Sequence, residues 1–282
     1  MIRKASSSTS RYMSAALVWA GLSALFIGPA GAFPAGSEPS GPRVRNSTRS
    51  FKIVAVERSD NGDYRLSLKN ENTKTITAFR VFLPSSKRSI REDFQATGEP
   101  IAPGAIEVLH IPSESLASAG DDLSSNQANV LITAVVFDDK TGDGKAEVLA
   151  EIGAERFGEK RQLTRAASQL RKMLGAGDTQ LIASLDSLRS ENWAASVEAE
   201  AASLLLDFRS ESFDYAGSPD EVIARGIKTG LQSGLEKARR MFADLEAYRS
   251  IDDGTPAPVI TSKVREASEK IISEFEKIIE KL

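Results

Sequence analysis

The spacing of apolar residues changes near Gly144, and this change restricts the possible folds more than any other feature of the sequence. Before it, Tyr64, Leu66 and Leu68 alternate with polar residues, which is typical of a strand with one buried face. After it, apolar residues recur at helical spacing. The sequence therefore predicts an α+β protein of two domains, with strands over residues 51–145 and helices over 146–282.

The strand region is expected to form an antiparallel immunoglobulin-like β-sandwich of about six short strands. The runs with strand character lie at 51–56, 64–68, 75–83, 106–111 and 130–137. The first three follow one another closely and predict a meander. Asn61-Gly62 predicts a type I′ hairpin turn at residues 60–63, because both residues accept the positive φ that this turn requires. The run 130–137 is nearly all apolar, which indicates a strand covered on both faces.

The helical region is expected to form an antiparallel bundle. Its segments are predicted over about 146–174, 179–188, 193–208, 218–248 and 258–282. The clearest start is Ser218-Pro219-Asp220-Glu221, where Ser218 can cap the helix, Pro219 suits the first position and Glu221 completes a capping box. The last two segments each carry one apolar stripe, which has to be buried against neighbouring helices.

The first 32 residues have the order of a secretory signal peptide. Basic residues without any acid precede an apolar run from Ala15 to Ile27, and Pro29 and the small residues Ala30-Gly31-Ala32 follow it. We expect cleavage after Ala32, with an uncleaved membrane anchor as the alternative. Residues 33–50 are rich in Pro, Gly and Ser, which predicts a flexible linker. The mature chain is thus predicted to be periplasmic or extracellular, without a stable membrane span.

The chain has no cysteine and a single histidine, His110. These counts exclude disulfides, thiol catalysis and zinc sites built from Cys and His. Removal of residues 1–32 takes away three positive charges and no negative ones, which changes the formal net charge from −3 to −6 and argues against a nucleic-acid partner. Ser113 and Ser115 lie near His110, but a residue three positions along an extended chain points to the opposite face, so no His–Ser catalytic pair is predicted.

One loop begins like a calcium-binding loop. Counted from Asp139, an acid stands at the fifth position and Gly144 at the sixth, but Thr141 and Ala150 occupy the third and twelfth positions, where such a loop uses acids. A complete cage cannot form. Asp138, Asp139 and Asp143 are therefore either a polar corner between strand and helix or a weak cation site. Beyond this open question, the sequence predicts no catalytic, cofactor-binding or metal-binding residue and no cofactor.

Gly226, Gly230 and Gly234 share one side of the predicted helix 218–248. Each glycine in a helix interior costs about 0.5–1 kcal/mol relative to alanine, so the three together predict a close helix crossing, either within the bundle or with a partner. Basic residues also concentrate on the first helix, between residues 156 and 172. Because no aromatic residues interleave with them, a solvated face is expected rather than a polyanion site.

Two segments resemble a group of bacterial proteins. Residues 68–79, LKNENTKTITAF, and 135–144, VVFDDKTGDG, which lead into an Arg/Glu-rich helix, resemble uncharacterised exported proteins of soil bacteria such as the Acidobacteria, with an immunoglobulin-like N-terminal domain. The resemblance covers about residues 51–174. It implies export and a domain boundary near residue 145, and it brings no activity and no catalytic residues.

The function that these features favour is a non-enzymatic protein-interaction or structural module of the cell envelope. Its expected partner is another envelope or extracellular protein. A hydrolase or small-ligand-binding protein is the alternative, with a site formed where acids and serines of separate helices converge. A third possibility is that the uncleaved leader tethers the helices near the membrane.

Overall fold

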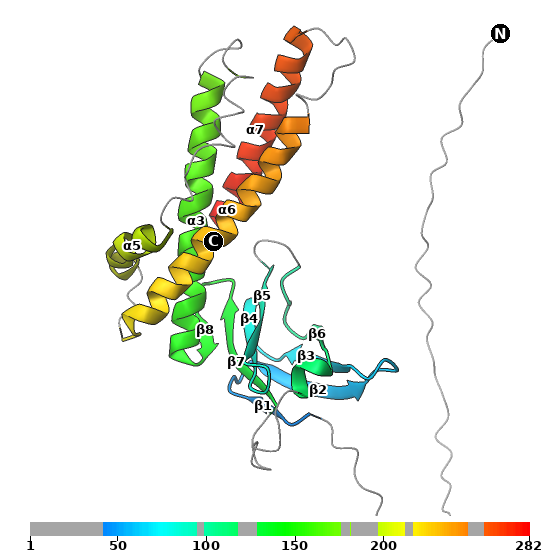
Figure 1. Cartoon of the computed structure of the whole chain (residues 1–282). Helices are drawn as coiled ribbons and strands as arrows, with labels where there is room; N and C mark the ends of the chain where they lie inside the picture. Colours follow the sequence, from blue (N-terminus) through cyan, green and yellow to red (C-terminus); the bar gives the residue numbers. More distant parts are fainter. Residues whose placement is uncertain are drawn as a thin grey trace, which may run out of the picture. The chain divides into compact units, whose positions relative to one another are not determined.

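The computed structural model describes residues 42–94, 99–117, 129–175, 181, 197–211, 217–247 and 257–282, which form two β-sheets and five helices (Figure 1). Residues 41–282 belong to one compact unit. The predicted signal peptide at 1–32, residues 33–41 of the predicted linker and, apart from Leu181, the helix at 179–188 lie outside the described residues. An α+β fold is confirmed for the described part of the chain.

One sheet has the strand order β2-β3-β6, with antiparallel pairing throughout. Its strands are β2 (Phe51–Arg58), β3 (Tyr64–Asn70) and β6 (Ile106–Ile111). The hairpin between β2 and β3 is confirmed, but the predicted type I′ turn is wrong. Gly62 has a φ of 89°, whereas Asn61 has no positive φ, and the Gly62 N–H donates to the Ser59 carbonyl at 2.9 Å. The loop therefore has three residues, with glycine alone in the left-handed region.

The other sheet has the order β1-β7-β4-β5, and β8 pairs with β7. Its strands are β1 (Val44–Asn46), β4 (Ile76–Leu83), β5 (Arg88–Asp93), β7 (Val130–Phe137) and β8 (Gly142–Gly144). The predicted meander is wrong, because β4 leaves β3 and joins this second sheet. The β1·β7 pair is parallel, whereas the other pairs are antiparallel. Residues 44–46, within the predicted linker, form β1.

The two sheets share one hydrophobic core. Phe51 of β2 meets Phe79 of β4 edge to face, with ring centroids 5.5 Å apart. On the other face of β7, Ala134 and Val136 pack against Ile152 of the first long helix. Strand β7 is therefore covered on both faces, as its nearly continuous apolar sequence predicts.

Four of the five helices are long: α3 (Ala146–Gly175), α5 (Val197–Glu211), α6 (Asp220–Ala247) and α7 (Ala257–Lys281). The short helix α2 (Glu114–Ala117) follows β6. The predicted apolar stripes are confirmed, since Leu163, Phe242 and Phe275 belong to one core between α3, α6 and α7. None of the helices in the described ranges is long and apolar enough to cross a membrane.

The expectation of an antiparallel bundle holds for α7 but is wrong for α6. From Gly226 to Gly234, α6 meets α3 in the order Glu151, Glu155 and Glu159, so the two helices run in the same direction (Figure 1). Helix α7 runs the opposite way, because Arg265 contacts the carbonyl of Leu174 while Glu276 pairs with Arg171. Parallel neighbours need a long return connection, and residues 176–219, which include α5, supply it.

Candidate functional site

The most distinctive surface of the molecule is a groove between two edge strands. Strand β5 ends one sheet and β6 ends the other, and both line one pocket of about 420 Å³. An edge strand carries backbone N–H and C=O groups without a neighbouring strand. We call this pocket the edge groove; its lining residues are Leu83, Arg88, Ser89, Ile90, Glu92, Glu107, Val108, Leu109, His110, Pro112 and Ser115.

Strand pairing explains which side chains of β5 enter the edge groove. Glu92 lies opposite Phe79, and Ile90 lies opposite Val81. Residues directly opposite each other in an antiparallel pair lie on the same face of the sheet. Phe79 and Val81 are buried in the shared core, so Glu92 and Ile90 also face inward, and so does Arg88 at the next alternate position.

The same reasoning places two residues of β6 on the opposite wall. Glu107 lies opposite Leu68 and Leu109 lies opposite Leu66, and both leucines of β3 are fully buried. Glu107 and Leu109 therefore face the space between the sheets, whereas Ile106 and Val108 point outward, with 53% and 43% of their surface exposed.

The groove has three zones along its length. Glu92 and Glu107 interact electrostatically and form an acidic zone. Ile90 lies two residues before Glu92 on β5, and Leu109 lies two residues after Glu107 on β6. Together they form an apolar zone. Arg88 follows at the other end of β5, so the groove changes from acidic through apolar to basic.

A second pocket of about 400 Å³ continues the basic zone and shares Arg88 and Ser115 with the edge groove. Lys87 lines it beside Ser85 and Ser86, together with one acid, Glu114. The hydroxyl oxygens of these two serines are buried and have no hydrogen-bond partner in the described structure. This end of the groove is therefore rich in hydrogen-bond donors.

Among the described residues, the charges in the groove have no ion-pair partner. Burial, with a further contribution from the charge of Glu92, raises the pKa of Glu107. Within the described ranges, no ion pair engages Glu92, Glu107 or Arg88. Partly buried carboxylates normally have a cation or several donors nearby. The acidic zone is thus a place where a cation from outside would be stabilised.

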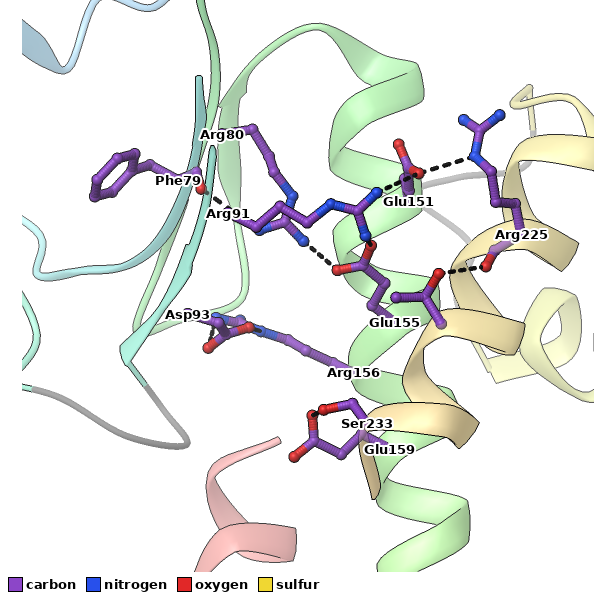
Figure 2. Close-up of polar contacts among 11 residues, drawn as sticks. Phe79, Arg80, Arg91, Asp93, Glu151, Glu155, Arg156, Glu159, Arg225 and Ser233 are labelled. Atoms are coloured by element: carbon purple, nitrogen blue, oxygen red, sulfur yellow. Dashed lines mark hydrogen bonds and ion pairs between the residues drawn. The ribbon is translucent and has the colours of Figure 1, made fainter. Parts of the chain in front are cut away.

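The opposite face of β5 is very different (Figure 2). Arg91 donates to Glu155 of α3 at 2.7 Å, and Glu155 also pairs with Arg80 of β4. The side chains of Arg80 and Glu155 are only 6% and 14% exposed. Burial raises the pKa of Glu155 and lowers that of Arg80, and the attraction between the two opposes both shifts.

More ion pairs extend this cluster, which we call the junction cluster; its members are Arg80, Arg91, Asp93, Glu151, Glu155, Arg156 and Arg225. Arg156 of α3 contacts Asp93 of β5 at 2.9 Å, and its other nitrogen donates to Thr77. Arg225 of α6 contacts Glu151 at 3.0 Å. Every charged member has an opposite partner, so this cluster holds α3 against the sheet and offers no group for chemistry.

The glycine face of α6 is used inside the molecule. A Cβ added at Gly230 would overlap the carbonyl oxygen of Glu155, and one at Gly226 would lie 2.7 Å from the Cβ of Ala154. Gly158 of α3 allows the same close approach from the other helix, because a Cβ there would overlap the carbonyl oxygen of Ile227. Of the two readings of these glycines, the crossing within the bundle is the one observed.

The three acids of the possible cation site do not converge. The Asp143 carboxylate accepts hydrogen bonds from the backbone N–H groups of Arg49 and Ser50, at 2.6 and 2.9 Å, and ties β8 to the chain before β2. Asp139 pairs with Lys74 at 2.6 Å, and hydrogen bonds from Lys74 and Thr141 lower its pKa to about 2. Across the described part of the chain, no group of three His, Cys, Asp or Glu side chains could hold a metal ion. The polar corner is the reading that fits.

His110 and Ser115 both line the edge groove. Ser113, however, donates its backbone N–H to Asp63 at 2.9 Å, and no hydrogen bond joins His110 to either serine in the described residues. The pairing of His110 with Arg65 places its side chain on the outer face of the sheet.

Most of the basic residues on α3 have acidic partners. Arg161 contacts Glu211 at 2.6 Å, and Arg165 pairs with Glu200, both acids lying on α5. These residues line a pocket of about 490 Å³ between α3 and α5. Its hydroxyls on Thr164 and Ser168 donate to backbone carbonyls one turn earlier. Both arginines of the pocket between these helices are thus paired with acids, and both hydroxyls are satisfied.

No family model matches the sequence, and no curated protein or solved structure matches it either. The resemblance to exported bacterial proteins stays a prediction. Sequence reasoning missed the groove residues Arg88, Glu92 and Glu107, because the run 88–93 contains one apolar residue and gives no strand signal. One signal was present in 106–111, where Glu107 alternates with Leu109 and Ile111 on the face that turns inward.

Proposed function

We propose that the chain is an exported, non-enzymatic protein-interaction module of the cell envelope, with the edge groove as its binding surface. The observation that carries this proposal is the meeting of two edge strands, β5 and β6, along a groove whose charges have no partner among the described residues. Edge strands and partly buried, uncompensated charges are unfavourable in an isolated protein. A partner that adds backbone hydrogen bonds and opposite charges would remove both costs.

The proposed architecture is an immunoglobulin-like sandwich over residues 51–145 joined to a helical bundle over 146–282. Two sheets around one core support the sandwich, and the common core of α3, α6 and α7 supports the bundle. The junction cluster fixes α3 to β4 and β5, so β5 is held in place from its outer face. Binding surfaces on rigid elements keep their geometry without an entropic cost of ordering.

The proposed location is the periplasm or the space outside the cell, following cleavage of a signal peptide after Ala32. The order of basic, apolar and small residues in 1–32 supports this location. The proposed partner is another envelope or extracellular protein. The net negative charge supports a protein rather than a nucleic acid as partner.

A small-ligand-binding protein or hydrolase is the second candidate. It is favoured by one observation: Glu92 and Glu107 face each other in a pocket of about 420 Å³, and burial raises the pKa of Glu107. A carboxylate pair with one raised pKa is typical of enzymes that hydrolyse glycosidic bonds. In this candidate function the acids come from strands, and not from the separate helices that the sequence suggested.

Photocrosslinking in the native cells tests the proposal. A photoreactive amino acid at Ser89, an exposed residue of the edge strand β5 between the groove residues Arg88 and Ile90, is expected to crosslink one protein reproducibly in the exported fraction. The matched control carries the same amino acid at Glu221, an exposed residue at the start of α6. Crosslinks from Glu221 alone, or from neither position, would contradict the proposal. Amino-terminal sequencing of the crosslinked product tests cleavage after Ala32.

A further inference from the structure

The three zones of the edge groove repeat at a fixed spacing. On β5, the inward side chains are Arg88, Ile90 and Glu92, each two residues from the next. On β6, Glu107 and Leu109 face them with the same spacing. A period of two is the side-chain period of extended chain, so an extended segment beside β5 would present alternate side chains in step with these zones.

The backbone of β5 can hold such a segment. As the last strand of its sheet, β5 pairs with β4 and with no other strand among the described residues. An extended peptide that adds to a free edge gains main-chain hydrogen bonds, and the pockets that receive its alternate side chains decide which peptide binds. A strand added to β5 would direct every second side chain into the groove that Ile90 and Leu109 line.

The charges of the groove determine the chemistry of those side chains. Glu92 and Glu107 form the acidic zone, and no described cation pairs with them. A lysine or arginine side chain there would form charge-assisted hydrogen bonds with carboxylates that now repel each other. An acid in the same place would add a third negative charge. At the other end, the two cations Arg88 and Lys87 outnumber the single acid Glu114, so this end suits a carboxylate.

We propose that an extended segment of the protein partner adds to β5 and directs three alternate side chains into the edge groove: a basic one between Glu92 and Glu107, an aliphatic one between Ile90 and Leu109, and an acidic one beside Arg88. This inference rests on the proposed function. It specifies a pattern in the partner, basic-x-aliphatic-x-acidic, in either chain direction. In a strand parallel to β5 the acidic residue comes first, and in an antiparallel strand the basic residue comes first.

Selection from a displayed library of random nonapeptides on the purified exported protein tests this pattern. We expect the pattern to be enriched about tenfold or more over the unselected library, the size of effect that one additional charge-assisted contact gives. The double variant Glu92→Gln, Glu107→Gln is expected to lose the preference for a basic residue. Glu57→Gln, which changes an exposed glutamate of β2, is the matched control and should retain it.

Two results would overturn the inference: selection of no peptide, or of peptides whose preference for a basic residue survives the double variant. Thermal unfolding of each variant checks that the fold is intact. A crosslinked partner at Ser89 without the pattern would overturn this inference and leave the proposed function standing. Absence of any crosslink at Ser89 would overturn the proposed function itself, whatever the peptides show.

Discussion

The two faces of strand β5 carry similar charged residues in opposite situations. On the outer face, Arg91 and Asp93 contact Glu155 and Arg156 of α3. On the inner face, Arg88 and Glu92 enter the edge groove and have no ion-pair partner in the described ranges. Charge alone therefore says nothing about the role of a residue on this strand. The difference lies in whether the chain itself supplies the partner, as it does for the junction cluster.

The largest effect on stability is expected from a substitution that breaks the buried ion pair of the junction cluster. Glu155→Ala would leave the buried guanidinium of Arg80 without its carboxylate. Removal of one partner from a buried ion pair costs about 3–5 kcal/mol. Urea unfolding at neutral pH should show this loss of the free energy of unfolding. The double variant Arg80→Met, Glu155→Leu should recover most of it, since neither partner of the pair is then left buried without the other. Equal destabilisation by both would contradict a role for charge pairing.

A second, smaller effect is expected at the helix crossing that holds α3 in place. Gly230→Ala would put a Cβ into the backbone of α3 at Glu155, so the helices would have to separate. Overpacking of this kind costs about 1–3 kcal/mol. Gly175→Ala is the matched control, because no described atom outside the helix's own backbone lies within 4 Å of the added Cβ. The control should be neutral or slightly stabilising in urea unfolding. A similar loss in both variants would contradict the close contact at Gly230 as the cause, because helix propensity alone favours alanine over glycine.

In the edge groove, loss of the Glu107 charge should slightly raise stability at neutral pH, where the carboxylate is ionised, and should change the pH dependence of stability. The pKa of Glu107 is raised by burial and by Glu92. At a pH between the unfolded and the folded pKa, Glu107 therefore keeps a proton in the folded protein that it has lost in the unfolded chain. Stability therefore falls as pH rises from the ordinary glutamate value of about 4.3 through the folded pKa. In Glu107→Gln this fall should be smaller. Melting temperatures between pH 4 and 7 check it, with Glu57→Gln as control; identical profiles would contradict the raised pKa.

The smallest effect on stability is expected from the addition of calcium. Because Asp143 and Asp139 are engaged with Ser50 and Lys74, the three acids of the corner cannot gather around one ion. Millimolar calcium should leave the melting temperature unchanged and give no saturable heat in a calorimetric titration. A saturable signal that disappears in Asp143→Asn would restore the cation site as the correct reading.

The parts of the fold that sequence predicted are those where a single periodicity dominates. The alternation in β3, the apolar run of β7 and the start of α6 at Asp220 were all readable. Strands β1, β5 and β8 were not, since β1 and β8 have three residues each and β5 is mostly charged. The groove depends on which strands end the two sheets, and that follows from tertiary pairing. The alternation in β6 could identify Glu107 as an inward-facing acid, but nothing in the sequence indicated that Glu92 of β5 lies near it.

The parallel direction of α3 and α6 has a consequence for the order of folding. Ser233 contacts Glu159, although the two residues are 74 positions apart in the chain. A contact of this sequence separation forms only after a long loop has closed, which makes it slow. Strands β1 to β8 all precede residue 145 and need none of α6 for their pairing. A chain that emerges from its N-terminus can therefore assemble both walls of the groove, β5 and β6, before α6 reaches α3.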